Sequence, residues 1–225
     1  MTHTATTRTP EQTEIGVFWA YDGRPSLCAP PRLYNQIAMV IADKMGTSKD
    51  AVKLARLLAL INLAMADTGI AIWDAKYEYN LWRPISGIRG AAGGTGSLVA
   101  DANWYPYGAP ASNAQGPNFT PPFPSYPSGH AGFGGALFQM LRNFYGTDDI
   151  AFDFVSDEYN GQTKDGSGNP RPVVKRSYTQ LSQAEEENGQ SRIYLGIHWV
   201  FDKTSAITVG QKVADEVFAR ALTPL

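Results

Sequence analysis

Residues 127–146 read PSGHAGFGGALFQMLRNFYG and carry the clearest helix signal in the chain. Ser128 is a favourable N-cap at its start, and Gly146 is a favourable stop at its end. We therefore expect a helix over 128–145 with one apolar face turned toward a core. The residues of that face recur every three or four positions: Phe133, Leu137, Met140, Leu141 and Phe144.

Other helices are expected on both sides of this one, each with its own start or stop signal. They cover 10–21, 30–46, 48–83, 179–195 and 198–222. Because the residue before a proline disfavours helical geometry, the third should end at Arg83, just ahead of Pro84. Residues 150–179 are polar and suggest at most a small hairpin. The predicted fold class is therefore all-α, a helical bundle.

A long segment without helical periodicity, residues 86–127, separates the third helix from the 128–145 helix. Seven of the 15 prolines lie between Pro106 and Pro127, among several aromatic residues. Proline stiffens such a segment, and loops of this length in a compact domain are usually functional. We expect a long, ordered loop rich in proline and glycine.

Composition places the chain among soluble globular proteins, because 43% of its residues are hydrophobic and 18% charged. The 225 residues are expected to form a single domain, 1–225, with residues 1–8 disordered. A net charge of −2 argues against a nucleic-acid partner or an anionic membrane surface. The single cysteine, Cys28, excludes an internal disulfide and a metal site built from cysteines.

Neither a leader nor a membrane span is expected in this sequence. Residues 1–10 have no apolar core of a signal peptide, so a cytoplasmic location is expected unless a leader has been removed. The most hydrophobic stretch, 54–73, is interrupted by Arg56, Asn62 and Asp67. A buried core helix explains that stretch better than a membrane span does.

Two basic residues, Lys76 and Arg83, form the first candidate for chemistry. Seven residues on a helix are two turns, so both cations should leave one face about 10 Å apart. A solvated basic face is the simpler explanation for such a pair. The intervening residues argue against it, because Tyr77 and Trp82 are not typical of a solvated face.

The other two candidates lie at helix ends. Ser128, Gly129 and His130 begin the 128–145 helix, where free N–H groups and the helix dipole favour an anion. A plain serine N-cap with an incidental histidine is the alternative. Arg192 ends one helix and His198 begins the next, which is equally compatible with a dipole-neutralising arginine and a packed histidine.

Taken in order, the three segments form the pattern Lys-x6-Arg-Pro, Pro-Ser-Gly-His and Ser-Arg-x5-His. This signature is shared by type 2 phosphatidic acid phosphatases, bacterial acid phosphatases and vanadium-dependent haloperoxidases. The chain resembles the vanadium chloroperoxidase branch in particular, through Trp73, FTPPFP at 119–124 and SRIYLGIHW at 191–199. The resemblance runs from residue 9 to 224 and matches the C-terminal half of longer members, which carry a further helical bundle ahead of it.

The resemblance implies a fold and a cofactor. The fold is the helical bundle of the acid phosphatase and vanadium haloperoxidase type, and the cofactor is vanadate, with vanadium bound by His198. His130 is implied as the acid–base group. The oxygens of the oxyanion are implied to be held by Lys76, Arg83, Arg192, Ser128 and the Gly129 N–H.

Three further residues follow from the same resemblance. Asp22 matches a carboxylate that orients Arg192, while Trp73 and Phe123 are implied to form an apolar rim for the halide. Lys76 is the best candidate to polarise the bound peroxide. The implied activity is oxidation of a halide by hydrogen peroxide through a histidine-bound peroxovanadate, with an organic compound as the possible acceptor.

Two other functions fit the same signature. In an acid phosphatase, His198 attacks phosphorus to form a phosphohistidine and His130 protonates the leaving alcohol. A non-catalytic oxyanion-binding or assembly module would suit a shortened chain. The aromatic residues Trp73 and Phe123 favour the haloperoxidase over the phosphatase, and the presence of both histidines argues against a module that only binds.

Assembly is expected because longer family members pack two bundles side by side. The long helix carries more apolar residues than one packed face requires, namely Leu54, Leu57, Leu58, Ile61 and Met65. An exposed apolar patch usually marks an interface. We expect a homodimer with two-fold symmetry or, alternatively, pairing with a separate N-terminal half.

Overall fold

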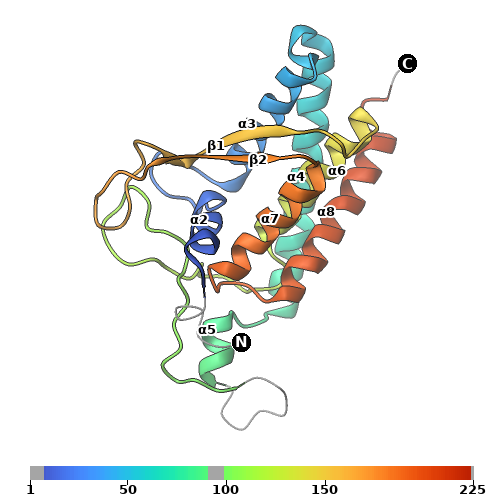
Figure 1. Cartoon of the computed structure of the whole chain (residues 1–225). Coiled ribbons are helices and arrows are strands. Elements are labelled where there is room, and N and C mark those ends of the chain that lie inside the picture. The colour runs from blue at the N-terminus through green and yellow to red at the C-terminus, as the bar shows by residue number, and fades with distance from the viewer. Residues whose placement is uncertain (1–7, 91–98, 224–225) are drawn as a thin grey trace.

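The computed structural model describes residues 8–90 and 99–223, which form a helical bundle and one small hairpin (Figure 1). The chain is therefore mostly helical and not strictly all-α, because its hairpin forms a two-stranded antiparallel sheet. In chain order the elements are α2 (Pro10–Phe18), α3 (Pro30–Lys44), the short 3-10 helix η1 (Thr47–Lys49), α4 (Ala51–Tyr79), α5 (Pro84–Gly90), α6 (Gly129–Tyr145), β1 (Phe152–Asn160), β2 (Val173–Tyr178), α7 (Leu181–Tyr194) and α8 (Val200–Arg220).

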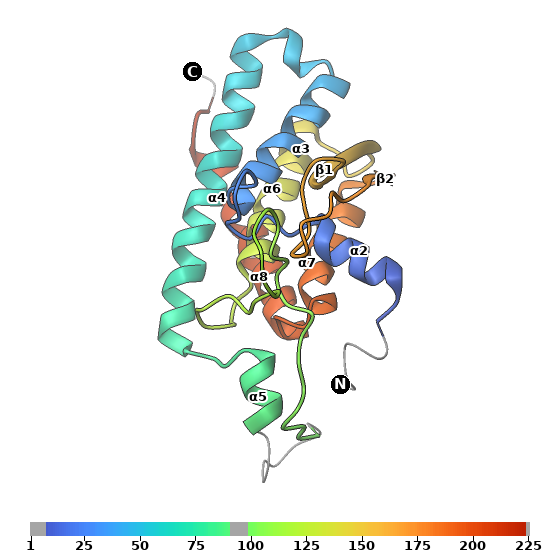
Figure 2. The ribbon, with the colours of Figure 1, turned by 90° about the vertical axis from the view of Figure 1, so that its left-hand side faces the viewer.

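The helix predicted over 128–145 is confirmed as α6 and lies in the middle of the bundle (Figures 1 and 2). Its N-cap is Ser128, whose hydroxyl oxygen accepts the backbone N–H of Ala131, and Gly146 ends it in a left-handed conformation. It contacts α3, α4, α7 and α8. A central helix of this kind brings its N-terminus close to several other segments.

Glycine lets α6 and α8 touch through their backbones. A Cβ atom on Gly135 would lie 2.6 Å from the carbonyl oxygen of Ile207. A Cβ atom on Gly210 would lie 2.2 Å from the carbonyl oxygen of Gly132. Neither distance is compatible with a side chain, so the crossing requires glycine at both positions.

Helix α4 begins three residues later and ends four residues earlier than the predicted helix 48–83. Its N-cap is Asp50, which accepts the N–H groups of Val52 and Lys53, whereas Ser48 lies in η1. It ends at Tyr79, where Asn80 adopts a left-handed conformation with a φ of 43°.

Pro84 does not follow the end of α4 but opens the separate helix α5. Proline is well suited to the first position of a helix, because its missing N–H has no partner there and its φ is already helical. Lys76 and Arg83 therefore do not share one helix face, contrary to the prediction, since four residues of non-helical chain separate α4 from α5.

The apolar residues that were expected to overload α4 mostly face the core. Leu57, Ile61 and Met65 are buried, and Leu54 and Leu58 pack against the same cluster. Other apolar side chains of α4 remain exposed, among them Leu63, Ile70 and Tyr77. By length and composition alone, the segment Ala51–Gly90 could also cross a membrane. Its most apolar 18-residue stretch has a mean hydropathy of 1.5, and 39% of that stretch is buried.

The hairpin β1–β2 covers α2 and α3 (Figure 1). Alternate residues of β1 are buried, including Phe152 and Phe154, as expected for a sheet with one face on the core. The hydroxyl of Ser156 donates to the carbonyl oxygen of Phe18 at 2.6 Å. The hairpin thus fixes the C-terminal end of α2.

The long loop is ordered where the structure describes it, over residues 99–128. Trp104 is buried within it, and Ala109 pairs with Phe119 through both backbone hydrogen bonds. The N–H of Gly108 donates to the carbonyl oxygen of Leu195. The predicted disorder of residues 1–8 concerns residues outside the described range, except for Arg8, whose Nε donates to Thr13.

Candidate oxyanion site

A cavity of about 400 Å³ lies at the N-terminus of α6 and is lined by residues from several distant segments. Lys76 and Ser128, also predicted for this site, are fully buried and do not form part of the lining. The other eight predicted site residues all line the cavity: Asp22, Trp73, Arg83, Phe123, Gly129, His130, Arg192 and His198.

Arg83 reaches the cavity from the short link between α4 and α5. Its Nε donates to the carbonyl oxygen of Phe123 and its Nη1 to that of Ile197, both at 2.9 Å. Its Nη1 also lies 2.9 Å from Nε2 of His198. The buried Nη2 has no partner among the described residues. Burial, more than any neighbouring charge, lowers the pKa of Arg83 to about 10.

Arg192 lies in the last turn of α7 and is paired with Asp22 of the loop after α2. Its Nη1 lies 3.1 Å from both carboxylate oxygens of Asp22 and 3.1 Å from Nε2 of His130. Its buried Nε has no partner among the described residues. The pair agrees with the expected orientation of Arg192 by Asp22.

His130 occupies the first turn of α6 and is hydrogen-bonded through Nε2 to the carbonyl oxygen of Ala20. Burial, and after it the charge of Arg192, lowers its pKa to about 4. The backbone of His130 is also fixed, because its carbonyl oxygen accepts from the Tyr34 hydroxyl and from the Asn188 amide. His130 is therefore neutral near pH 7 in the absence of an anion.

His198 follows α7 and is oriented by Asp202, which the sequence analysis missed. Its Nδ1 lies 2.8 Å from Oδ2 of Asp202, so this nitrogen carries the proton and Nε2 keeps its lone pair. Burial and the charges of Arg83 and Lys76 hold the pKa of His198 well below its usual value. The spacing of four residues on a helical start was the available signal for Asp202.

Ser125 is a second residue that the sequence analysis missed. Its hydroxyl donates to the same oxygen, Oδ2 of Asp202, and lies 3.4 Å from Nδ1 of His198. Nothing in the sequence distinguished this serine from the other polar residues of the long loop.

Lys76 is fully buried and binds backbone oxygens of the loop that precedes α6. Its ammonium donates to the carbonyl oxygens of Pro124, Ser125 and Pro127. Burial, and then the charge of Arg83, lowers its pKa to about 7. Its three donors are thus all in use, which differs from the direct contact with an oxyanion that was expected.

One wall of the cavity is aromatic. The ring of Trp73 lies 5.6 Å from that of Phe123 and 6.2 Å from that of Phe133, centroid to centroid. A Cβ on Gly129 would come within 3.1 Å of the Trp73 ring, so glycine permits this close packing. The predicted apolar rim of Trp73 and Phe123 is present next to the first N–H groups of α6, which have no partner within the helix.

Glu158 of β1 supports the segment that carries Ala20 and Asp22. Its side chain is fully buried, accepts the backbone N–H of Tyr21 at 3.3 Å and pairs with Arg171 at 2.6 Å. Burial raises the pKa of Glu158 to about 7. Tyr21 has a φ of 45°, a conformation that needs such support. The sequence gave no reason to single out this glutamate among the polar residues of 150–179.

Positive charge exceeds negative charge around the cavity. Two arginines line it with one carboxylate, Asp22, and Lys76 lies close behind. The lowered pKa values of Lys76, Arg83 and both histidines have burial as their first cause and neighbouring cations as a further one. A bound anion would raise these pKa values, so the arrangement is suited to an oxyanion.

Comparison with known proteins identifies the same group of proteins from sequence and from structure. The sequence profile described as "VCPO second helical-bundle domain" matches residues 56–225. The vanadium chloroperoxidase of Curvularia inaequalis is 40% identical over 233 aligned residues. That match covers 90% of this chain and 38% of the relative, so the chain spans well under half of the relative's length.

Two solved structures are similar over nearly the whole chain. The first bacterial vanadium-dependent iodoperoxidase superposes with a TM-score of 0.68 at 29% identity, over 93% of this chain and 43% of the other. The holo form of a bacterial vanadium-dependent chloroperoxidase superposes with a TM-score of 0.71 at 17% identity, over 96% and 46%. The second likeness concerns the fold alone.

Proposed function

This chain belongs to the vanadium chloroperoxidase family, and we propose on that premise that it binds vanadate and oxidises a halide ion with hydrogen peroxide. One observation supports the proposal most directly. The cavity combines unpartnered N–H groups on two buried arginines with an unprotonated histidine nitrogen, Nε2 of His198. This nitrogen accepts from Nη1 of Arg83, a hydrogen bond that coordination of a metal would replace. Such a set of donors binds an oxyanion and can also coordinate its central atom.

The residues present fit vanadate by their donor chemistry. A buried N–H without a partner costs about 1–3 kcal/mol, which an oxyanion oxygen would recover at Nη2 of Arg83 and Nε of Arg192. Within the described residues, no group of three His, Cys, Asp or Glu side chains is arranged to hold a metal cation. A single imidazole ligand with surrounding cations is instead suited to a metal that arrives as an anion.

Each residue would have a distinct part in holding the group. His198 would coordinate vanadium through Nε2, while Arg83, Arg192 and the N–H of Gly129 would bind the oxygens. Ser128 is committed to capping α6, so its hydroxyl would contribute only its proton. Lys76 would act mainly through its charge, because a direct bond to the peroxide requires that one of its three carbonyl partners be released.

Vanadate, when bound, would supply a Lewis acid that activates hydrogen peroxide without a change of oxidation state. The overall conversion of halide and peroxide to hypohalous acid and water consumes one proton. His130 is placed to deliver it, since it lies at the cavity and its pKa rises when an anion binds. Trp73 and Phe123 would exclude water from the halide, and an organic acceptor would then react with the oxidised halogen.

The test is a pair of assays on the purified chain, with and without added orthovanadate. We expect peroxide-dependent bromination of an organic indicator that requires vanadate and is lost in His198→Ala. The converse result, phosphate-ester hydrolysis that vanadate inhibits, would identify an acid phosphatase in which Nε2 of His198 attacks phosphorus. Vanadate binding without either reaction would identify a binding module and refute the proposed activity.

A further inference from the structure

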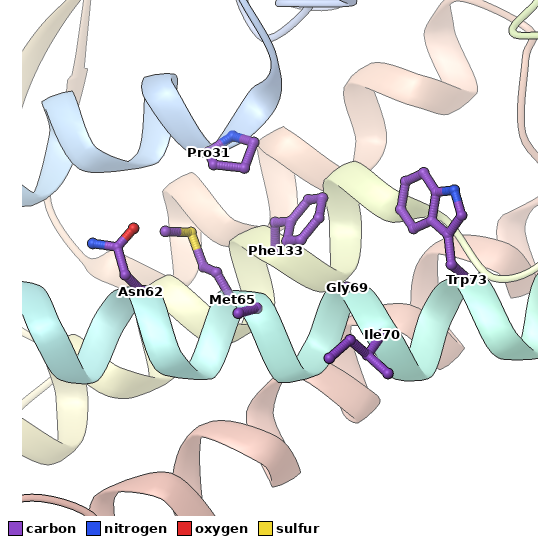
Figure 3. A pocket seen from close by; sticks show the side chains of 8 residues that line it. Pro31, Asn62, Met65, Gly69, Ile70, Trp73 and Phe133 are labelled. Carbon is purple, nitrogen blue, oxygen red and sulfur yellow. The ribbon is translucent and has the colours of Figure 1, made fainter.

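The outward face of α4 is mostly apolar and carries several exposed hydrophobic side chains. Relative exposure is 81% at Val52, 43% at Leu63, 70% at Ile70 and 64% at Tyr77, although all four side chains are hydrophobic. In Figure 3, Ile70 projects from the side of α4 opposite Phe133, at the edge of the groove that both residues line. We define the α4 stripe as the residues that recur here at alternating spacings of four and three: Val52, Arg56, Ala59, Leu63, Ala66, Ile70, Trp73 and Tyr77.

Such spacing is typical of one helix packed along another. Within the described residues most of the stripe is uncovered, because the buried residues of α4 lie on its other faces. Two positions are exceptions. Arg56 donates to the carbonyl oxygen of Leu222 and lies over the Phe144 and Phe218 rings, and Trp73 packs against Phe123 and Phe133. A continuous exposed apolar surface is rarely left open on a monomer. The stripe is therefore suited in shape and spacing to packing against another helix.

We propose that the partner is a second copy of this chain, with the two α4 helices antiparallel about a two-fold axis between residues 64 and 65. In that arrangement the stripe is complementary to itself in size. Small residues meet large ones, with Ala59 opposite Ile70 and Ala66 opposite Leu63. Val52 meets Tyr77. Positions 56 and 73 also lie opposite each other, but the Arg56 guanidinium stays with its own chain, where it donates to the carbonyl oxygen of Leu222 and lies over the Phe144 and Phe218 rings.

Charge also favours this partner and this direction. The N-terminal part of α4 carries Lys53 beside the stripe and Arg56 within it, and its C-terminal part carries Asp74 and Glu78 beside it. An antiparallel pair places the basic end of each helix against the acidic end of the other. A parallel pair would place like charges together, which costs free energy.

The interface would adjoin the oxyanion site. A groove of about 530 Å³ beside the stripe shares Pro31, Trp73 and Phe133 with the site cavity (Figure 3). The N-terminal half of the second α4 would therefore lie beside the outer edge of the aromatic wall. Assembly and the site would be in contact through Trp73.

The first experiment measures mass in solution by sedimentation velocity and light scattering over a concentration series. We expect a dimer of twice 24.5 kDa at micromolar concentration. Ile70→Glu should raise the dimer dissociation constant roughly a hundredfold, because each dimer contains the position twice and about 1.4 kcal/mol per copy is tenfold. Val173→Glu, a matched control on β2 with 65% exposure, should leave the dimer unchanged.

The second experiment tests the register by cross-linking in a Cys28→Ser background. Ala59→Cys with Ile70→Cys should oxidise to a covalent dimer, because the two positions face each other across the axis. Within one helix they are about 16 Å apart, too far for an internal disulfide. Ala59→Cys with Tyr77→Cys should remain uncross-linked, since position 77 lies opposite residue 52.

Three outcomes would overturn the proposal. A monomer of 24.5 kDa throughout the series would assign the stripe to another partner, such as a separate helical bundle. A dimer that tolerates Ile70→Glu would place the interface elsewhere. Equal cross-linking of the two cysteine pairs would refute the antiparallel register.

Discussion

The two sides of the cavity balance their positive charge by different means. On one side Arg192 faces both oxygens of Asp22 at 3.1 Å. On the other side Arg83 donates to two carbonyl oxygens and contacts the His198 imidazole, and Lys76 donates to three carbonyl oxygens. One side therefore holds a direct ion pair, whereas on the other side the carboxylate of Asp202 contacts the His198 imidazole and the two cations donate to carbonyl oxygens.

This difference predicts where an incoming anion is attracted most strongly. Burial is the first cause that lowers the pKa values of Lys76 and Arg83, to about 7 and about 10, and the more distant Asp202 offsets it only in part. His198 lies on this same side. We therefore expect the side of Arg83 to dominate oxyanion affinity and the side of Arg192 to serve orientation and proton transfer.

The largest expected effect separates the two histidines. His198→Ala should abolish stable vanadate binding, because the nitrogen that we propose as the vanadium ligand is removed. His130→Ala should retain binding and lose most halide oxidation, because only a hydrogen bond and the path of a proton are removed. Calorimetry with orthovanadate and a bromination assay give the two readouts, and equal vanadate affinity in His198→Ala and the parent would contradict the assignment.

The next largest effect concerns Arg83, which donates to carbonyl oxygens and has no direct carboxylate partner among the described residues. Arg83→Lys replaces a planar fork by a point charge, so oxyanion binding should weaken by about 1–3 kcal/mol. Arg89→Lys is a suitable control, because Arg89 donates to the carbonyl oxygen of Trp104 outside the cavity lining. Unchanged vanadate affinity in Arg83→Lys would show that Arg83 does not contact the anion.

A smaller effect is expected from the carboxylate that orients His198. Asp202→Asn should weaken vanadate binding by about tenfold. This is the low end of the range for residues that orient a metal ligand, because an amide oxygen can still accept from Nδ1 of His198. Asp215→Asn, a change of the same kind on the far part of α8, should have no effect on calorimetric affinity. A loss in both variants would indicate a general effect on the fold.

The smallest effect is a dependence on pH. Sulfate keeps its double charge between pH 6 and pH 9, and its affinity should fall several-fold over this range as Lys76, with a pKa near 7, loses its proton. Glu158 gains a negative charge over the same range, because its pKa is also about 7. The measurement is therefore repeated in Glu158→Gln, and a flat profile there would remove Lys76 as the cause.

Sequence signals located the helices well where the signal was local. Ser128 and Gly146 bound α6 as predicted, because caps act on adjacent backbone groups. Pro84 was misinterpreted, since proline is compatible with the end of one helix and the start of another. Only the left-handed turn at Asn80 decides between the two, and asparagine is a weak signal for that conformation.

Only the family resemblance predicted that the candidate site residues come together in the fold, because no local pattern in the sequence indicates it. The cavity brings eight of those residues together, but their roles stay predictions until the variants are measured. Ser125, Asp202 and Glu158 could not be ranked beforehand, because their importance depends on which distant backbone group or ring each one meets. The long-range pairs of a buried network are set by packing and are not encoded in spacing along the chain.

The crossing of α6 and α8 has a consequence for the timescale on which the site can move. Side chains exchange rotamers within picoseconds to nanoseconds, but the contacts at Gly135 and Gly210 are between backbones and have no rotamers to exchange. The start of α6, one turn away, is therefore insulated from fast side-chain motion. Displacing it requires sliding of whole helices, which takes microseconds or longer. The first N–H groups of α6 therefore keep their positions throughout many encounters with small molecules.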